Sequence, residues 1–204
     1  MIEMVYLSVL TIGFILALSL KNRIFDIPFF RTFLLISLTF ELVNRHFATL
    51  GNNWVINNVY TIFTVTYYLW VFKLNRFQLL GNIFLWVYVI LTIFYLYKQN
   101  PNSYFHGVRY NVGMLMTFFS ILIYFRYLML YEYKKNFFKN ELVWMGFGIV
   151  LFYVCSFPIL TFAEYFTKNE TAFGSALFDL VQLGNVFLYL GYVMAILCPY
   201  LIKK

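Results

Sequence analysis

The residues in this sequence most able to do chemistry are charged and amide side chains that interrupt long apolar stretches. Between residues 29 and 47, Ser37, Glu41, Asn44 and Arg45 recur at spacings of three and four. A helix would place them on one face, where Glu41 and Arg45 can pair. A charged side chain at the centre of a membrane-spanning helix costs about 2.5 to 3.5 kcal/mol on insertion scales. Charged residues kept in such a place therefore suggest a function.

Three further apolar stretches carry polar side chains at helical spacing. One holds Asn57 and Thr61, one begins with Arg109, and the last holds Asp179, Gln182 and Asn185. Most of these residues fall in the same half of their predicted helices, so the sequence predicts one ligand-binding site with Glu41 and Asp179 facing the interior. The predicted site residues are Glu41, Arg45, Asn57, Thr61, Arg109, Asp179, Gln182 and Asn185. The alternative is a structural clamp, because polar contacts between helices also stabilise membrane bundles, by about 0.6 kcal/mol each.

The last apolar stretch has a second face made of small residues. Gly184, Gly191 and Ala195 lie opposite its polar positions. Small side chains let the backbone of a neighbouring helix approach closely. We therefore expect one side of this helix to pack tightly and the other to line the predicted site.

Known catalytic and metal-binding patterns are absent from the sequence. The chain has only His46 and His106, too few for a three-histidine zinc site, and Gly174-Ser175 does not form a nucleophile elbow. No phosphate-binding loop, Cys-x-x-Cys motif or dinucleotide-binding glycine pattern occurs. We expect no cofactor and no metal, and an enzyme using Glu41 and Asp179 is the least favoured function.

Composition indicates a helical membrane protein. The 204 residues are 63% hydrophobic and 11% charged, with a mean hydropathy of +0.77, whereas a soluble domain has about 25% charged residues. Apolar stretches separated by charge, Pro, Gly or Asn predict helices over 4–20, 29–47, 54–74, 79–97, 109–131, 142–163 and 174–201. The connections between them are short, so we expect an all-α bundle of about seven spans over residues 1–204, as a single domain without an extramembrane part.

The basic residues predict the orientation in the membrane. Seven spans with an outer N-terminus put eleven of the 15 lysines and arginines on the cytoplasmic side, leaving Arg45, Lys98, Arg109 and Lys168 outside. The positive-inside rule favours this arrangement. The net charge of +7 is spread between apolar stretches, so we expect no direct binding of nucleic acid. We expect a multi-pass protein of the cell membrane, namely the inner membrane of a bacterium.

With no catalytic pattern, the sequence favours a sensor, a receptor or a regulatory accessory subunit, for example in a bacterial signalling or defence system. Such a protein would bind a small polar ligand from the outer side and act through a protein partner or through a second copy of itself.

The alternative is a small-solute transporter or channel. Seven helices, an outer N-terminus and about 200 residues resemble the three-plus-one-plus-three sugar transporters. This resemblance implies two three-helix repeats, in which Asn58-Val59-Tyr60 would match Asn185-Val186-Phe187. That pair is offset by 127 residues, whereas the similar segments KNRIF at 21 and KKNFF at 134 are offset by 113. No single repeat register therefore holds.

Overall fold

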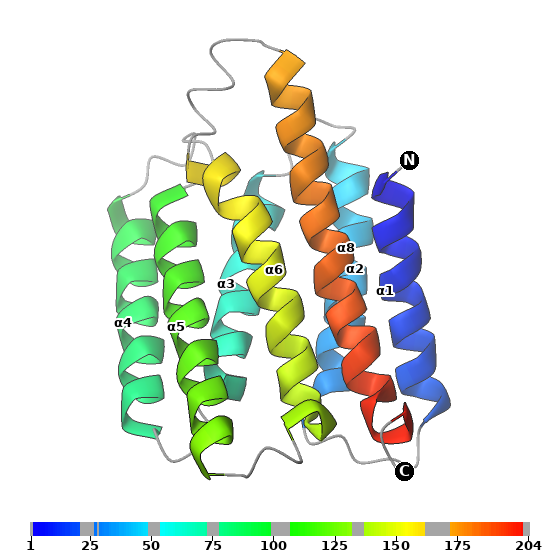
Figure 1. Cartoon of the computed structure of the whole chain (residues 1–204). Helices are drawn as coiled ribbons and strands as arrows, with labels where there is room; N and C mark the ends of the chain where they lie inside the picture. Colours follow the sequence, from blue (N-terminus) through cyan, green and yellow to red (C-terminus); the bar gives the residue numbers. More distant parts are fainter. Residues whose placement is uncertain are drawn as a thin grey trace. The chain divides into compact units, whose positions relative to one another are not determined.

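The structure is a computed structural model that describes residues 2–20, 27, 29–48, 54–72, 78–98, 107–131, 137–161 and 172–201 (Figure 1). These residues form seven α-helices, one 3₁₀ turn and no strand, so the all-α prediction is confirmed over the described ranges. The elements are α1 (Ile2–Ser19), α2 (Phe30–Ala48), α3 (Trp54–Phe72), α4 (Gln78–Lys98), α5 (Gly107–Tyr131), η1 (Phe137–Lys139), α6 (Glu141–Thr161) and α8 (Ala172–Leu201).

Each predicted helix corresponds to an observed one, and every end lies within two residues of its predicted position. Two described segments are long and apolar enough to cross a membrane, Tyr110–Leu130 and Asp179–Leu201. The described parts of three other helices are apolar but shorter, namely Met4–Ser19, Leu80–Phe94 and Glu141–Phe157. These lengths fit association with a membrane, and the seven-span arrangement stays a prediction.

The chain divides into two compact units. Unit 1 consists of Met1–Leu38 and Phe125–Lys204, and unit 2 of Thr39–Tyr124. The division passes through α2 and α5, so these two helices contribute to both units. The two units are described separately below, and the single-domain prediction stays a prediction.

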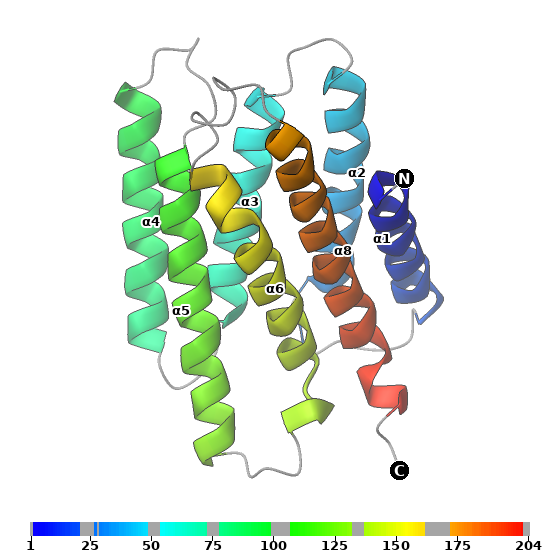
Figure 2. The ribbon, with the colours of Figure 1, turned by 45° about the horizontal axis from the view of Figure 1, so that its top comes forward.

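In unit 1, α8 lies between α6 and α1 in both views (Figures 1 and 2). Its glycines pack against α6: a Cβ on Gly191 would lie 2.7 Å from Cα of Gly148 and 2.9 Å from the Trp144 carbonyl oxygen. A Cβ on Gly184 would lie 3.0 Å from Cβ of Cys155, and Ala195 is fully buried. The predicted tight packing of the Gly184, Gly191 and Ala195 face is confirmed.

The other side of α8 packs through aromatic rings. Tyr6 of α1 lies 5.8 Å from Tyr189 between ring centroids, while Phe30 and Phe33 of α2 approach Tyr192 edge-on at 5.9 and 5.8 Å. Edge-to-face contacts of this kind add about 0.5 to 1.5 kcal/mol to the burial of the rings. The order of the contacts places α1 parallel to α8, so the chain starts and α8 finishes at opposite ends of unit 1.

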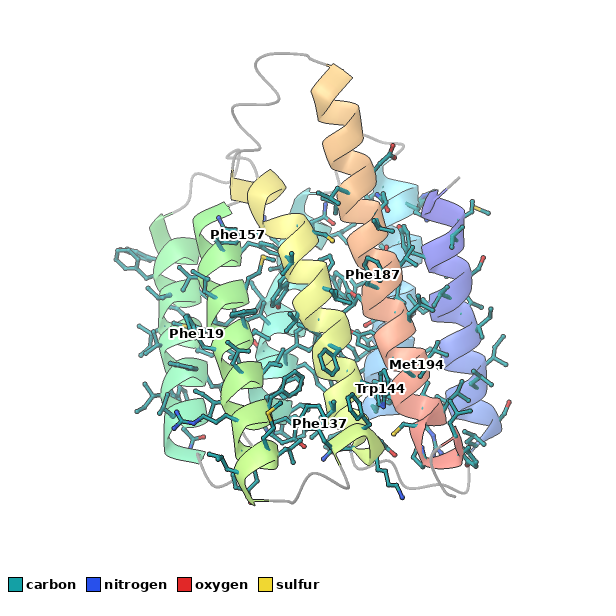
Figure 3. All side chains as sticks on the ribbon, in the orientation of Figure 1. Phe119, Phe137, Trp144, Phe157, Phe187 and Met194 are labelled. Atoms are coloured by element: carbon teal, nitrogen blue, oxygen red, sulfur yellow. The ribbon has the colours of Figure 1, made fainter. Side chains whose placement is uncertain are left out.

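The end of unit 1 at which α1 and α8 finish is fixed by polar contacts. Arg31 donates to the carbonyl oxygens of Ala17 and Leu20, and so caps the last turn of α1. The carbonyl oxygen of Phe138 in η1 accepts from Nε1 of Trp144 at 2.9 Å and from Sγ of Cys198 at 3.1 Å. The 3₁₀ turn is therefore attached to both α6 and α8. Figure 3 labels Trp144, the residue of α6 that makes the first of these contacts.

The same end of unit 1 contains one strained residue. Phe29, which immediately precedes α2, has a φ of 53°, in the left-handed region that favours glycine. For a residue with a Cβ this conformation costs roughly 1 to 2 kcal/mol. The Phe29 side chain is nonetheless 73% exposed.

In unit 2, α5 lies beside α4 in both views, and α3 packs against both helices (Figures 1 and 2). Gly113 of α5 makes this packing possible, because a Cβ there would lie 2.7 Å from the Tyr88 ring of α4 and 3.0 Å from Val65 of α3. Val65, Leu69 and Tyr88 form the buried core, each no more than 1% exposed. Phe40 of α2 stacks on Tyr60 of α3, with ring centroids 5.2 Å apart.

Candidate functional site: a polar layer in unit 2

Two sets of contacts fix the register of the four helices in unit 2. Phe40 of α2 lies level with Tyr60 and Phe63 of α3. Gly113 of α5 lies level with Tyr88 of α4 and Val65 of α3. Because each helical residue rises about 1.5 Å, the height of any other residue follows from its distance along the chain from these contacts.

All four helices place polar residues just beyond the apolar core, toward the end at which α3 and α5 begin. Glu41, Thr61, Thr92 and Tyr110 lie roughly 5 to 7 Å from the level of Val65, and Asn44, Arg45, Asn57 and Asn58 lie roughly 10 to 13 Å from it. We call this set the polar layer: Glu41, Asn44, Arg45, Asn57, Asn58, Thr61, Thr92 and Tyr110. The core residues Val65, Leu69 and Tyr88 lie beneath it.

The most buried members of the polar layer are Asn58 and Thr61, both 6% exposed, with Thr92 also at 6% and Tyr110 at 8%. Glu41, Asn44, Arg45 and Asn57 are half-buried. Glu41 and Arg45 each interact with another group. Their predicted pairing with each other stays a prediction.

Thr92 differs from the other threonines of unit 2 whose hydrogen bonds the structure describes. Thr61, Thr64 and Thr117 each donate their hydroxyl to a carbonyl oxygen one turn earlier, at 2.8 to 2.9 Å. The Thr92 hydroxyl is buried and has no hydrogen-bond partner among the residues that the structure describes. Oδ1 of Asn44 is buried without a donor in the same way. A buried polar atom without a partner costs about 1 to 3 kcal/mol, so both positions call for an explanation.

Four of the predicted site residues belong to unit 2, and the register of Phe40 against Tyr60 and Phe63 puts them at similar heights on α2 and α3: Glu41, Arg45, Asn57 and Thr61. Arg109 belongs to α5, but its side chain lies outside the described residues. The predicted set omitted Asn58 and Thr92. Thr92 is the only serine or threonine in α4. A single threonine in such an apolar helix could have identified this position from the sequence.

The remaining predicted residues belong to α8 in unit 1. Gln182 is 8% exposed with no hydrogen-bond partner for its Oε1, and Asn185 is half-buried. Ser37 of α2, fully buried, also has a hydroxyl without a partner. It lies about 6 Å along α2 beyond Phe33, which packs against Tyr192 of α8.

The prediction that Asp179 faces the interior is wrong, because its side chain is exposed. Asp179 lies three residues before the buried Gln182. Three residues turn a helix by about 300°, so the two side chains point about 60° apart, and burial of one does not require burial of the other. α8 also begins at Ala172 and has 30 residues. Asp179 lies near the start of this helix, and an exposed position there spares its carboxylate the cost of losing hydration.

The polar layer offers hydrogen bonds rather than covalent chemistry. It combines one carboxylate, one guanidinium, three amides, two threonine hydroxyls and one tyrosine hydroxyl above an aromatic and aliphatic core. Among the side chains that the structure describes, no three His, Cys, Asp or Glu residues come together, so those ranges offer no metal site. Such a layer can orient a small polar molecule through several weak contacts.

The comparisons with known proteins add no relative. The chain matches no protein-family model, and neither the curated proteins nor the solved structures contain a significant match to it.

Proposed function

We propose that this protein is a seven-span membrane receptor or sensor that binds a small polar ligand in the polar layer and acts through a partner protein. The membrane part of the proposal is supported by an apolar stripe on α4. Trp86, Ile90 and Ile93 recur at helical spacing and are 61 to 63% exposed. A continuous exposed apolar surface of this kind is typical of contact with lipid.

The polar layer is the single observation that carries the binding function. Charged and amide residues within membrane helices are costly, and they commonly mark ligand or ion sites. Among the described residues, the buried polar atoms of the layer without a hydrogen-bond partner include Oγ1 of Thr92 and Oδ1 of Asn44. A ligand that hydrogen-bonds to either atom would remove the cost of leaving that atom without a partner.

The partner in the proposal follows from the chemistry of the layer. Its hydrogen-bonding groups can hold a molecule, but they do not form a nucleophile with its base or a metal centre. A bound ligand would therefore be read out by a change in the contacts of the helices with another protein.

Thermal unfolding of the purified protein in detergent, measured with amino acids, monosaccharides and nucleosides in turn, tests the proposal. We expect one chemical class to raise the unfolding temperature by about 5 to 10 °C at a concentration of 100 times its Kd, because selective binding to the folded state adds about 2.7 kcal/mol there. Thr92→Val and Asn44→Leu should lose most of this shift while remaining folded.

Thr11→Val is the matched control, because Thr11 lies in α1 and its hydroxyl is bonded to the carbonyl oxygen of Leu7. This variant should keep the full ligand-dependent shift. Equal shifts in Thr92→Val and in the unchanged protein would contradict a site in the polar layer. Uptake of the stabilising compound into proteoliposomes would identify a transporter instead of a receptor.

A further inference from the structure

One end of unit 1 combines exposed aromatic and basic side chains. It is the end at which α1 and α8 finish and η1 is attached. Five residues there are called the basic rim: Phe29, Arg126, Phe138, Lys139 and Tyr200. Phe29, Phe138 and Tyr200 are 73%, 55% and 52% exposed, and Arg126 and Lys139 are also exposed.

Charge is distributed unevenly between the two ends of unit 1. The lysine and arginine side chains described there are Arg31, Arg126 and Lys139, and all three lie toward the end carrying the basic rim. Of the two carboxylates described there, Glu141 lies at the same end but is only 2% exposed, and the exposed carboxylate of Asp179 lies toward the opposite end, near the start of α8. The rim therefore presents positive charge to whatever covers it.

The basic rim is also held in place by packing rather than carried on a loose connection. Phe137 packs between Phe125 of α5 and Phe147 of α6, with ring centroids 5.6 and 6.3 Å away. The Phe138 carbonyl oxygen is bound by Trp144 and Cys198, and Asn140 caps α6 through Leu142 N–H at 2.9 Å. Arg126 follows Phe125 directly, and Lys139 follows Phe138 directly. Both cations thus stand next to anchored aromatic residues.

We infer that the basic rim binds the headgroups of anionic phospholipids in the cytoplasmic leaflet, an inference that rests on the membrane part of the proposed function. Aromatic side chains favour the boundary between hydrocarbon and headgroups. Lysine and arginine beside them attract negatively charged lipids over about one Debye length. An acidic protein surface carries the same negative charge as these lipids, but charge alone does not account for the exposed aromatic side chains at this end of unit 1.

Titration of phosphatidylglycerol or phosphatidylcholine with identical acyl chains into the full-length protein in a neutral detergent tests this inference. We expect phosphatidylglycerol to raise the unfolding temperature by about 4 °C more than phosphatidylcholine, and this difference to shrink as salt rises from about 0.05 to 0.3 M. The double variant Arg126→Gln and Lys139→Gln should lose at least half of the difference. The double variant Lys98→Gln and Lys168→Gln, which removes two basic residues predicted on the outer side, is the charge-matched control and should keep it.

Equal stabilisation by the two lipids, or an undiminished difference in the double variant, would overturn the inference. Binding of an acidic protein to the basic rim, together with equal stabilisation by the two lipids, would also overturn the inference. None of these readouts involves the polar layer, so their failure leaves the ligand-binding proposal standing. A chain that stays soluble and folded without detergent would instead refute the membrane proposal itself.

Discussion

At the scale of single residues, the Thr92 hydroxyl gives the sharpest test of whether the polar layer is a site or a clamp. It is buried and lacks a hydrogen-bond partner. Val has nearly the same shape, so Thr92→Val should raise the free energy of unfolding of the ligand-free protein by about 1 to 3 kcal/mol, the desolvation cost of that hydroxyl. Chemical or thermal unfolding in a fixed detergent measures the change.

Thr117→Val serves as the comparison for Thr92→Val. Thr117 is fully buried, and its hydroxyl donates to the carbonyl oxygen of Gly113 at 2.9 Å. Its replacement should lower the free energy of unfolding by about 1 kcal/mol, the net contribution of an ordinary hydrogen bond. If Thr92→Val destabilises the protein as much as Thr117→Val does, the Thr92 hydroxyl is part of a structural clamp.

At the scale of helices, the contact between α6 and α8 depends on the absence of a side chain at Gly191. The atoms that a Cβ would meet there are backbone atoms of Gly148 and Trp144, at 2.7 and 2.9 Å, which cannot rotate away. Gly191→Ala should therefore lower the free energy of unfolding by about 1 to 3 kcal/mol, in the range of other overpacked sites. The same unfolding experiment measures it.

Gly13→Ala is the control for Gly191→Ala, because it places the same methyl group at another contact with α8. The nearest atom there is Cγ2 of the Val193 side chain at 3.2 Å, which can shift by a few tenths of an ångström. The change should leave stability within about 1 kcal/mol of the unchanged protein, since alanine also favours the helix. Equal losses in both variants would show that backbone contact is not what limits the α6–α8 distance.

The sequence predicts the helices well and the site only in part, for physical reasons. Long apolar stretches and the polar breaks between them determine where helices start and stop, so α2 and α3 were placed to within two residues. Spacing also predicts which residues share a face of one helix, such as Asn57 and Thr61, and their role as site residues stays a prediction. It does not predict which turns of a long helix its neighbours cover, which is why Asp179 was misplaced. Thr92 was missed because its role depends on the register of α4 against α5.

At the scale of the whole molecule, the seven-span proposal predicts which connections face each side of the membrane. Native Cys155 and Cys198 are first replaced by alanine and serine, the serine keeping a donor for the Phe138 carbonyl oxygen. Single cysteines are then introduced at positions outside the described residues, namely Asn52, Ser103, Lys168, Asn75 and Lys135.

Cysteines at Asn52, Ser103 and Lys168 should react with an impermeant thiol reagent added to intact cells. Those at Asn75 and Lys135 should react only after the cells are opened, because the positive-inside rule keeps the more basic connections in the cytoplasm. The reverse pattern would invert the orientation and place the basic rim outside. Labelling of all five positions in intact cells would exclude a membrane-spanning bundle.

The length of α8 has a practical consequence for imaging. The helix has 30 residues, about 45 Å, so in a bilayer roughly 15 Å of it should stand outside the hydrocarbon core. Small helical membrane proteins give electron microscopy few features beyond the micelle by which particles can be aligned. A helical carrier protein joined in phase with the first turn of α8 would continue the helix without a flexible joint. Because glycine contacts hold α8 firmly to α6, such a marker would report the orientation of unit 1 in every particle.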